Sequence, residues 1–328
     1  MAQDWRLFQG GDTEPHEVET WPTAPPWRRF GDDARRRDQQ RPLPYLISDE
    51  DRDVVNMALH LHRPLLVTGR PGTGKSTLAH AIARELKLGE VLHWPVNSRS
   101  TLTEGLYSYD AVGRLREASL KRRADETAGG TGAAKTAESE PDIGDYLRLG
   151  ALGTALLPAD RPRVLLVDEL DKGDVDLPND LLTVFEEGEF EIPELARLGE
   201  DTGIHVQFAG SRDKVEITGG WVSCSVFPVV VITSNGEREF PPAFLRRCVR
   251  LDLKQPDERQ LQRIVTMHLG KEIGARAQEL IADFVSRRNE RELATDQLLN
   301  AVRLRSSGVR VDQDVLDKLF RSLNEVDA

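Results

Sequence analysis

Between residues 45 and 254, short apolar runs alternate with longer stretches in which apolar and polar positions are mixed. In the mixed stretches, apolar residues recur at helical spacing, which predicts helices around Val54–Leu59 and Ser76–Leu86. Strands that alternate with helices form a parallel sheet with helices on both faces and right-handed crossovers. The sequence therefore predicts an α/β core whose strands lie at Pro64–Thr68, Glu90–Val96, Val164–Val167, Phe227–Thr233 and Val249–Leu253.

The strand-like runs stop after Gln255-Pro256, and only helical patterns follow. These patterns lie at Asp257–Leu269, Ala275–Asn289, Thr295–Leu304 and Val315–Leu323. We therefore expect two domains, an α/β domain over residues 45–254 and a small helical domain over residues 255–328.

The first 44 residues show neither helical nor strand periodicity and are rich in Pro, Asp and Arg, which predicts a mobile tail. Several aromatic residues interrupt this composition: Trp5, Phe8, Trp21, Trp27 and Phe30. They fit either a docking segment or loose packing against the rest of the chain.

Two further segments interrupt the alternation of strands and helices. Residues 124–141 are poor in large apolar residues and rich in Gly, Ala and Thr, which predicts a flexible surface insert. Within residues 203–220, alternating runs at His205–Phe208 and Lys214–Ile217 flank a short polar stretch, which predicts a β-hairpin.

Composition narrows the class of protein. The 328 residues include 55 Asp and Glu against 44 Lys and Arg, a formal net charge of −11, which argues against a surface built to coat nucleic acid. Cys224 and Cys248 are too few for a disulfide framework or a four-cysteine zinc site. No apolar run is long enough to span a membrane, and Met1–Gly11 lacks the apolar core of a signal peptide, so we expect a cytoplasmic protein.

The segment Gly69–Ser76 matches the pattern G-x-x-x-x-G-K-[ST] directly after a predicted strand and before a predicted helix. Glycines let the backbone N–H groups of such a loop point at phosphates, and the start of the next helix adds to the attraction. Lys75 is expected to reach the β- and γ-phosphates of a bound nucleotide, and the Ser76 hydroxyl to bind Mg²⁺. The predicted nucleotide-binding residues are Gly69, Arg70, Pro71, Gly72, Thr73, Gly74, Lys75, Ser76 and Thr77.

The strand Val164–Val167 ends in two acids, Asp168 and Glu169. Downstream of the phosphate loop, such a pair predicts that Asp168 holds Mg²⁺ and that Glu169 polarises the water that attacks the γ-phosphate. The next two charged residues, Asp171 and Lys172, fall on a predicted turn, where we expect a plain surface ion pair.

Asn235 follows the strand Phe227–Thr233. If that strand lies between the strands of the phosphate loop and of Asp168, the Asn235 amide can orient the attacking water. The alternative interpretation is a simple turn, because Asn-Gly is a favoured turn dipeptide.

Two adjacent arginines, Arg246 and Arg247, come just before the last predicted strand. An arginine at this place can reach a γ-phosphate bound by a neighbouring subunit and stabilise transition-state charge. The alternative is an ordinary pair of surface arginines.

Taken together, Gly69–Ser76, Leu165–Lys172, Thr233-Ser234-Asn235 and Pro241–Arg247 resemble an AAA+ ATPase of the MoxR-type, dynein-related branch, over roughly Tyr45 to the end of the chain. Asn56–Leu59, Arg63–Leu66, Tyr107–Ala111 and Gly113–Leu115 are also similar to that branch. The resemblance implies a P-loop sheet in the order 5-1-4-3-2, a helical lid and a hexameric ring that binds ATP between subunits. It makes Arg247 the preferred arginine finger, with Arg246 as the fallback.

The resemblance also implies that Leu106–Leu120 is the insertion in helix 2, and that the hairpin precedes the Asn235 strand. Both would face the pore of the ring or the partner.

One feature departs from the family pattern. Related lids carry a basic sensor residue at the start of their third helix, where this chain reads Ala294-Thr295-Asp296-Gln297. The nearest candidates, Arg291 and Arg303, do not match that position.

The function that we expect is Mg²⁺-dependent ATP hydrolysis that drives remodelling of a protein partner. The resemblance implies a partner with a von Willebrand factor A domain. One alternative is a nucleic-acid-stimulated motor of a restriction or defence system. The basic cluster Lys121-Arg122-Arg123 beside the insert is the only local argument for it, and a solvated charge run explains that cluster as well. The other alternative is a slow nucleotide-dependent binding switch.

Overall fold

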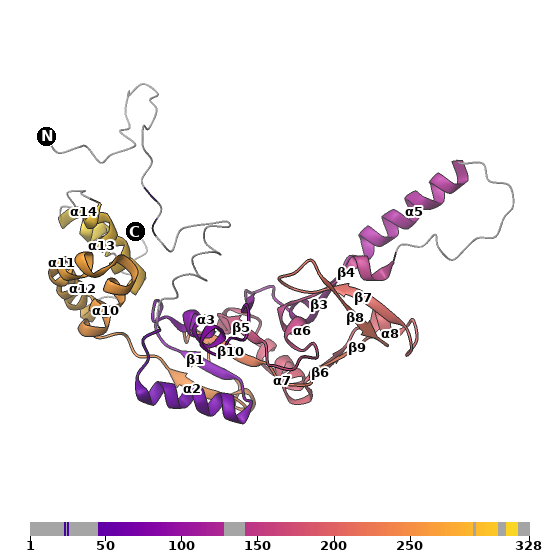
Figure 1. Cartoon of the computed structure of the whole chain (residues 1–328), viewed down its shortest axis with the longest axis horizontal. Helices are drawn as coiled ribbons and strands as arrows, with labels where there is room; N and C mark the ends of the chain where they lie inside the picture. The colour runs from indigo at the N-terminus through magenta and orange to yellow at the C-terminus, as the bar shows by residue number, and fades with distance from the viewer. Residues whose placement is uncertain are drawn as a thin grey trace, which may run out of the picture. The chain divides into compact units, whose positions relative to one another are not determined.

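Five parallel strands form the central sheet of the protein (Figure 1). The computed structural model describes Thr23, Pro25 and residues 45–127, 142–290, 293–307 and 313–320. The strand order is β11-β1-β10-β5-β2, which is the predicted order 5-1-4-3-2 when these five strands are counted along the chain. The structure thus confirms the α/β fold. The strands are β1 (Leu65–Thr68), β2 (Leu92–Pro95), β5 (Val164–Asp168), β10 (Val229–Ser234) and β11 (Val249–Asp252).

The central strands are continuous apolar runs because the sheet is covered on both faces. All residues of Val164–Val167 and Val230–Ile232 are at most 1% exposed. Parallel pairing aligns Thr68 with Ser234, and Ile232 with Val167. The carboxyl ends of β1, β10 and β5 therefore meet at one edge of the sheet, where ligands bind in open α/β folds.

Helices pack against the sheet at several places. Helix α3 (Lys75–Glu85) lies against β5 and β10, and α6 (Ala151–Ala155) lies against β2 and β5. Helix α2 (Asp49–Leu61) packs near β11. Its N-cap is Ser48, whose hydroxyl accepts a hydrogen bond from the N–H of Asp51 at 3.1 Å. Helices α7 (Leu177–Glu187) and α9 (Pro242–Leu245) contact each other.

A second sheet of four short strands has the order β3-β4-β7-β8. Strands β7 (Gly203–Gln207) and β8 (Lys214–Thr218) pair antiparallel, where the sequence predicts a hairpin. Strand β7 also pairs in parallel with β4 (Leu147–Leu149). The remaining short elements are α4 (Leu102–Leu106), β3 (Tyr107–Tyr109), η3 (Ile143–Tyr146), β6 (Glu189–Glu191), α8 (Pro193–Ala196) and β9 (Trp221–Ser223). Of these, β6 and β9 form a two-stranded antiparallel sheet of their own.

Helix α5 (Ala111–Thr127) runs out from the four-stranded sheet (Figure 1). It includes residues 124–127, with which the predicted flexible insert begins. The rest of that insert, 128–141, lies outside the described residues. The predicted mobile tail over residues 1–44 likewise lies outside them, except for Thr23 and Pro25.

After residue 254, all elements that the structure describes are helices. The helices are α10 (Glu258–Leu269), α11 (Lys271–Arg276), α12 (Gln278–Glu290), α13 (Thr295–Ser306) and α14 (Gln313–Leu319). They share an apolar core of their own, in which Phe284 and Phe320 meet edge to face with ring centroids 5.4 Å apart. A capping box at Asp257 and Gln260 starts α10.

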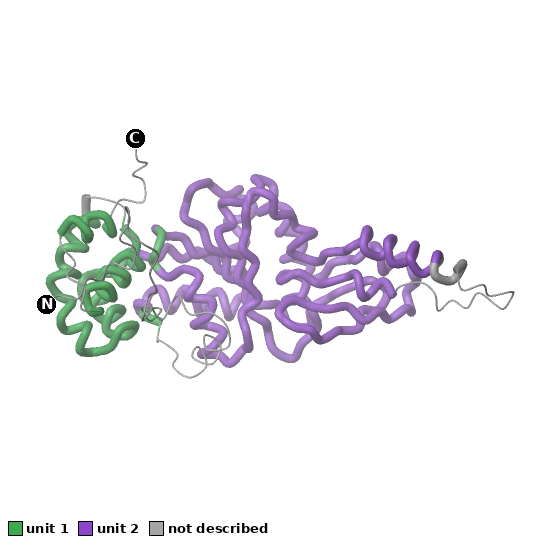
Figure 2. The backbone as a smooth tube through the Cα atoms, turned by 90° about the horizontal axis from the view of Figure 1, so that it is seen from above, with its two compact units in different colours: residues 1–46, 71–73, 255–328 green, residues 47–70, 74–254 purple. Residues whose placement is uncertain are grey.

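The chain divides into two compact units (Figure 2). Unit 1 holds the C-terminal helices together with Pro71–Thr73, and unit 2 holds residues 47–70 and 74–254. Among the helices that the structure describes, none combines the length and the apolar character needed to cross a membrane.

Candidate active site

The loop between β1 and α3 turns sharply at its three glycines. Gly69, Gly72 and Gly74 have φ angles of 144°, 76° and 88°, a region that residues with side chains rarely adopt. Gly74 is the N-cap of α3, so the helix begins at Lys75. Because N–H groups at a helix start have no partner within the helix, this end of α3 attracts anions.

Lys75 folds back onto its own loop. Its ammonium group donates hydrogen bonds to the carbonyl oxygens of Gly69 at 2.7 Å and Arg70 at 3.0 Å, and the residue is only 7% exposed. Burial lowers the pKa of Lys75, while the carboxylates of Asp171, Glu169 and Asp168 act in the opposite direction. The ammonium is therefore a buried cation close to three acids, held by contacts that a stronger anionic ligand can replace.

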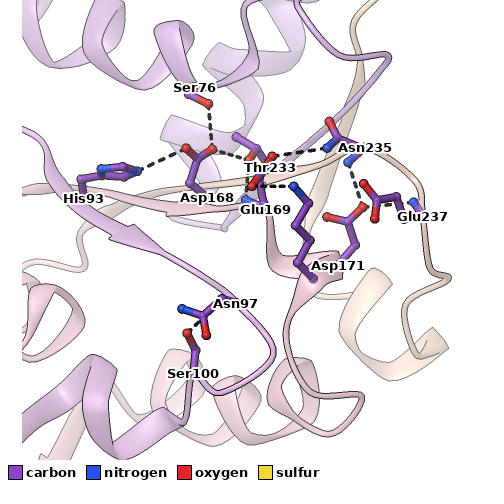
Figure 3. A network of polar contacts seen from close by, with 11 residues as sticks. Ser76, His93, Asn97, Ser100, Asp168, Glu169, Asp171, Thr233, Asn235 and Glu237 are labelled. Atoms are coloured by element: carbon purple, nitrogen blue, oxygen red, sulfur yellow. Dashed lines mark hydrogen bonds and ion pairs between the residues drawn. The ribbon is translucent and has the colours of Figure 1, made fainter. Parts of the chain in front are cut away.

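Asp168, at the end of β5, is the centre of the polar network in Figure 3. Its Oδ1 accepts hydrogen bonds from Ser76 Oγ at 2.7 Å and from Thr233 Oγ1 at 2.6 Å, and His93 Nε2 lies 3.2 Å from Oδ2. Burial disfavours the charged form, but the hydrogen bonds from Thr233, Ser76 and His93 outweigh it and hold the pKa of Asp168 below its ordinary value. The carboxylate is therefore ionised at neutral pH.

The donor set around Asp168 fits a magnesium ion. Mg²⁺ prefers oxygen ligands and is commonly held by one or two protein oxygens together with phosphates and water. The Ser76 hydroxyl and the Asp168 carboxylate are in direct contact, so one ion can reach both.

Glu169 turns its carboxylate toward Asn235 and Lys172. Its Oε1 is 3.5 Å from Asn235 Nδ2, and its Oε2 is 2.9 Å from Lys172 Nζ. The backbone of Glu169 is left-handed, with φ of 59°, which is uncommon for a residue other than glycine and is typical of constrained functional sites. The Glu169 N–H donates to Thr233 Oγ1 at 2.8 Å, so the adjacent strand holds this conformation.

Asn235 lies at a turn and its amide also faces Glu169, so it has the geometry that each of the two sequence interpretations requires. The chain turns after β10, where Gly236 has φ of 79°, and the Asn235 amide nevertheless faces Glu169. Strand β10 does lie between β1 and β5, which is the condition for this placement.

The prediction of a surface ion pair between Asp171 and Lys172 was wrong. The short 3₁₀ helix η4 (Leu170–Lys172) turns Asp171 inward, where it is 3% exposed and accepts hydrogen bonds from the N–H groups of Asn235 and Glu237. Lys172 pairs with Glu169 instead, and this hydrogen bond raises the pKa of Lys172.

The two arginines lie apart from the network around Asp168. Arg247 forms an ion pair through Nε with Glu186 of α7, and its NH1 donates to the carbonyl oxygen of Ala243 at 3.3 Å. The Arg246 carbonyl accepts a hydrogen bond from Arg63. Arg247 borders a surface cleft that Arg63 and Glu186 also line. The described contacts of these two residues thus lie away from the phosphate loop of their own chain.

Two residues of the network were not expected from the sequence. Thr233 links Asp168 to the Glu169 N–H and is 1% exposed, and His93 reaches Asp168 from β2. Both contacts cross between neighbouring strands, so they depend on strand register. The only local signal was a hydroxyl residue at the end of the apolar run of β10.

The other described residues that the sequence singled out lie outside the network around Asp168. Arg70 contributes its carbonyl oxygen to Lys75, and Thr77 is exposed on the first turn of α3. Helix α13 corresponds to the predicted third lid helix. Its first turn holds Thr295 and Asp296, and Arg303 in its last turn donates to Thr23 Oγ1 at 2.9 Å. Arg291 lies outside the described residues.

Comparison with known proteins places the chain in a family. A family model described as AAA domain (dynein-related subfamily) matches residues 64–248, which include the phosphate loop, Asp168, Glu169 and Asn235. The chain belongs to this family. An AAA domain implies nucleotide binding and a nucleotide-dependent activity.

No curated protein matches the sequence of this AAA protein. Among solved structures, the one titled "Structure of C. elegans PCH-2" is similar, with 14% sequence identity and a TM-score of 0.39. The match covers 85% of this chain and 69% of that chain.

Proposed function

We propose that the protein is a Mg²⁺-dependent ATPase that works as an oligomeric ring. The observation that carries this proposal is the contact between Ser76 and Asp168, with Glu169 directly after Asp168. It places a hydroxyl of the phosphate loop, a low-pKa carboxylate and a second carboxylate at one edge of the sheet. These are the groups that hydrolysis of a phosphoric anhydride requires.

Each residue has a distinct role in this proposal. The N–H groups of Gly69–Ser76 cradle the phosphates, and Lys75 exchanges its carbonyl partners for the β- and γ-phosphate oxygens. Ser76 and Asp168 hold the metal ion, which when bound neutralises charge on the β- and γ-phosphates. Glu169 takes a proton from the attacking water, while the amide of Asn235 orients that water.

The position of the arginines supports the ring in this proposal. Arg247 is away from the phosphate loop of its own chain, so we propose that it reaches the γ-phosphate bound by a neighbouring subunit, with Arg246 as the fallback. By resemblance to the MoxR-type branch, the ring is a hexamer. Residues 45–254 form its nucleotide-binding domain and residues 255–328 its lid.

The activity is tested by two substitutions with a matched control. Glu169→Gln should keep ATP binding and lower kcat by about 100-fold or more, because a general base contributes on that scale. Lys75→Ala should lose binding of a fluorescent ATP analogue. Glu187→Gln, an exposed acid at the end of α7, should leave both unchanged. Ordinary turnover by the Glu169→Gln protein would refute the assignment of the base.

The proposal also includes a class of protein partner. By the same resemblance, ATP turnover remodels a protein that contains a von Willebrand factor A domain. Affinity capture from the native host with the Glu169→Gln protein and ATP should retain such a protein, and the Lys75→Ala protein should not. Salt-sensitive stimulation of the ATPase by DNA or RNA, with no protein captured, would favour a nucleic-acid motor instead.

A further inference from the structure

Asp171 is an almost fully buried acid between the end of β5 and the loop after β10. Its Oδ2 accepts two backbone hydrogen bonds, from Asn235 N at 2.9 Å and from Glu237 N at 3.1 Å (Figure 3). Both donors follow β10, 64 and 66 residues away in the sequence. One carboxylate oxygen thus ties two segments that are distant in the chain.

A buried carboxylate is costly unless its hydrogen bonds compensate for lost water. The other oxygen of Asp171, Oδ1, is buried without a hydrogen-bond partner among the described residues. The described hydrogen bonds of this buried carboxylate therefore involve only one of its two oxygens, Oδ2. A buried group of this kind calls for an explanation beyond packing.

The residues that Asp171 joins are those proposed for water activation. Asn235, whose N–H is held, presents its amide 3.5 Å from Glu169 Oε1. Glu169 lies two residues before Asp171 and has a left-handed backbone conformation. Small movements of either segment would separate the amide from the carboxylate, because that contact is already long for a hydrogen bond.

We propose that Asp171 is a positioning residue for nucleotide hydrolysis, which clamps the loop Asn235–Glu237 to the turn that carries Glu169. The clamp keeps the amide of Asn235 and the carboxylate of Glu169 facing the same water. This inference rests on the proposed ATPase function. Asp171 would touch neither the nucleotide nor the metal ion and would act through Asn235 and Glu169, which contact the attacking water in the proposed mechanism.

Two substitutions of Asp171 separate the clamp from its negative charge. Asp171→Ala removes both hydrogen bonds. Asp171→Asn keeps them, because its amide oxygen can occupy the place of Oδ2, the atom that accepts both bonds. Asp174→Asn is the matched control, since Asp174 is an exposed acid on the same turn.

The first measurement is backbone hydrogen exchange of Asn235 and Glu237, which needs no ATP. In Asp171→Ala, exchange at these two amides should rise by about tenfold or more, while Val231 and Ile232 in β10 stay protected. In Asp171→Asn and in the control, exchange should remain as in the wild type. Equal protection in Asp171→Ala would overturn the clamp.

The second measurement is the split between kcat and KM for ATP. Asp171→Ala should lose about 10- to 100-fold in kcat with little change in KM, since misplacement of catalytic groups costs on this scale. Asp171→Asn should restore most of the loss. A purely structural role predicts lower thermal stability with wild-type kcat, and that result, or an Asn variant as inactive as the Ala variant, would overturn the proposal. If the wild type does not hydrolyse ATP, the proposed function fails, while hydrogen exchange still decides whether the clamp exists.

Discussion

The ammonium group of Lys172 lies 2.9 Å from Glu169 Oε2, whereas the amide of Asn235 faces the other carboxylate oxygen, Oε1. The proposed base is therefore already engaged by a cation before any nucleotide binds. Both side chains are about 40% exposed, so the pair contributes about 1 kcal/mol or less. Such a contact is weak enough to be exchanged during turnover.

We predict that Lys172→Met raises the ATPase rate modestly, by up to about fivefold, because it frees Glu169 from an exposed ion pair of that strength. Lys172→Arg, which keeps the charge, should behave like the wild type. Steady-state hydrolysis at saturating ATP measures the effect. A large loss of kcat in Lys172→Met would show instead that the lysine supports catalysis.

Thr233→Val should impair both stability and turnover. The substitution preserves the shape of the side chain but removes the donor to Asp168 and the acceptor for the Glu169 N–H. Because Thr233 is 1% exposed, the unpaired partners should lower the free energy of unfolding by about 1–3 kcal/mol. Urea denaturation measures this loss. Thr218→Val, at an exposed position of β8, should be nearly neutral, and equal stabilities of the two variants would contradict the assigned role.

Arg247→Ala should lower kcat and leave ATP binding intact, because in the proposed ring the arginine acts on a nucleotide bound by another subunit. The specific activity of the wild type should rise with protein concentration, and added Arg247→Ala subunits should reduce it more than in proportion to their share. Arg250→Ala, an exposed arginine of β11, is the control. A rate per subunit that does not depend on concentration would contradict action between subunits.

The Cys248 thiol should resist alkylation in the native protein. Burial raises the pKa of Cys248 to about 12, although nearby Arg63 acts in the opposite direction. An unfolded cysteine ionises near pH ~8.5, so stability should fall as the pH rises from there toward the folded pKa, because only the unfolded chain loses the proton.

A Cys224→Ala background leaves Cys248 as the only thiol of the chain. At pH ~8.5, iodoacetamide should modify it far more slowly in buffer than in urea, since the thiolate is the reactive form. Equal rates in the two solutions would show that the thiol is not buried.

Much of the sheet was predictable because its strands are continuous apolar runs. Val164–Val167 and Val230–Ile232 are buried on both faces, so hydrophobicity alone marked them. The order of the strands came from the resemblance of motifs, not from periodicity. Three-residue strands such as Tyr107–Tyr109 and Glu189–Glu191 were missed because they are too short to show an alternating pattern.

In the candidate active site too, residues in local motifs could be predicted from the sequence, and tertiary contacts could not. Lys75, Ser76 and Asp168 were predicted because their spacing in local motifs is set by phosphate and metal chemistry. The inward turn of Asp171 was not, because it depends on donors that follow β10 and meet the turn only after the sheet has formed. A charged residue on a turn is ordinarily solvated, and only tertiary contacts change that default.

The most direct test of the account is a structure of the Glu169→Gln protein with ATP and Mg²⁺. We predict that the phosphates lie along Gly69–Ser76, that Lys75 has left the carbonyl oxygens of Gly69 and Arg70 for the phosphates, and that Ser76 and Asp168 flank the metal ion. A structure with nucleotide bound elsewhere, and with Lys75 still on its own loop, would contradict the central claim.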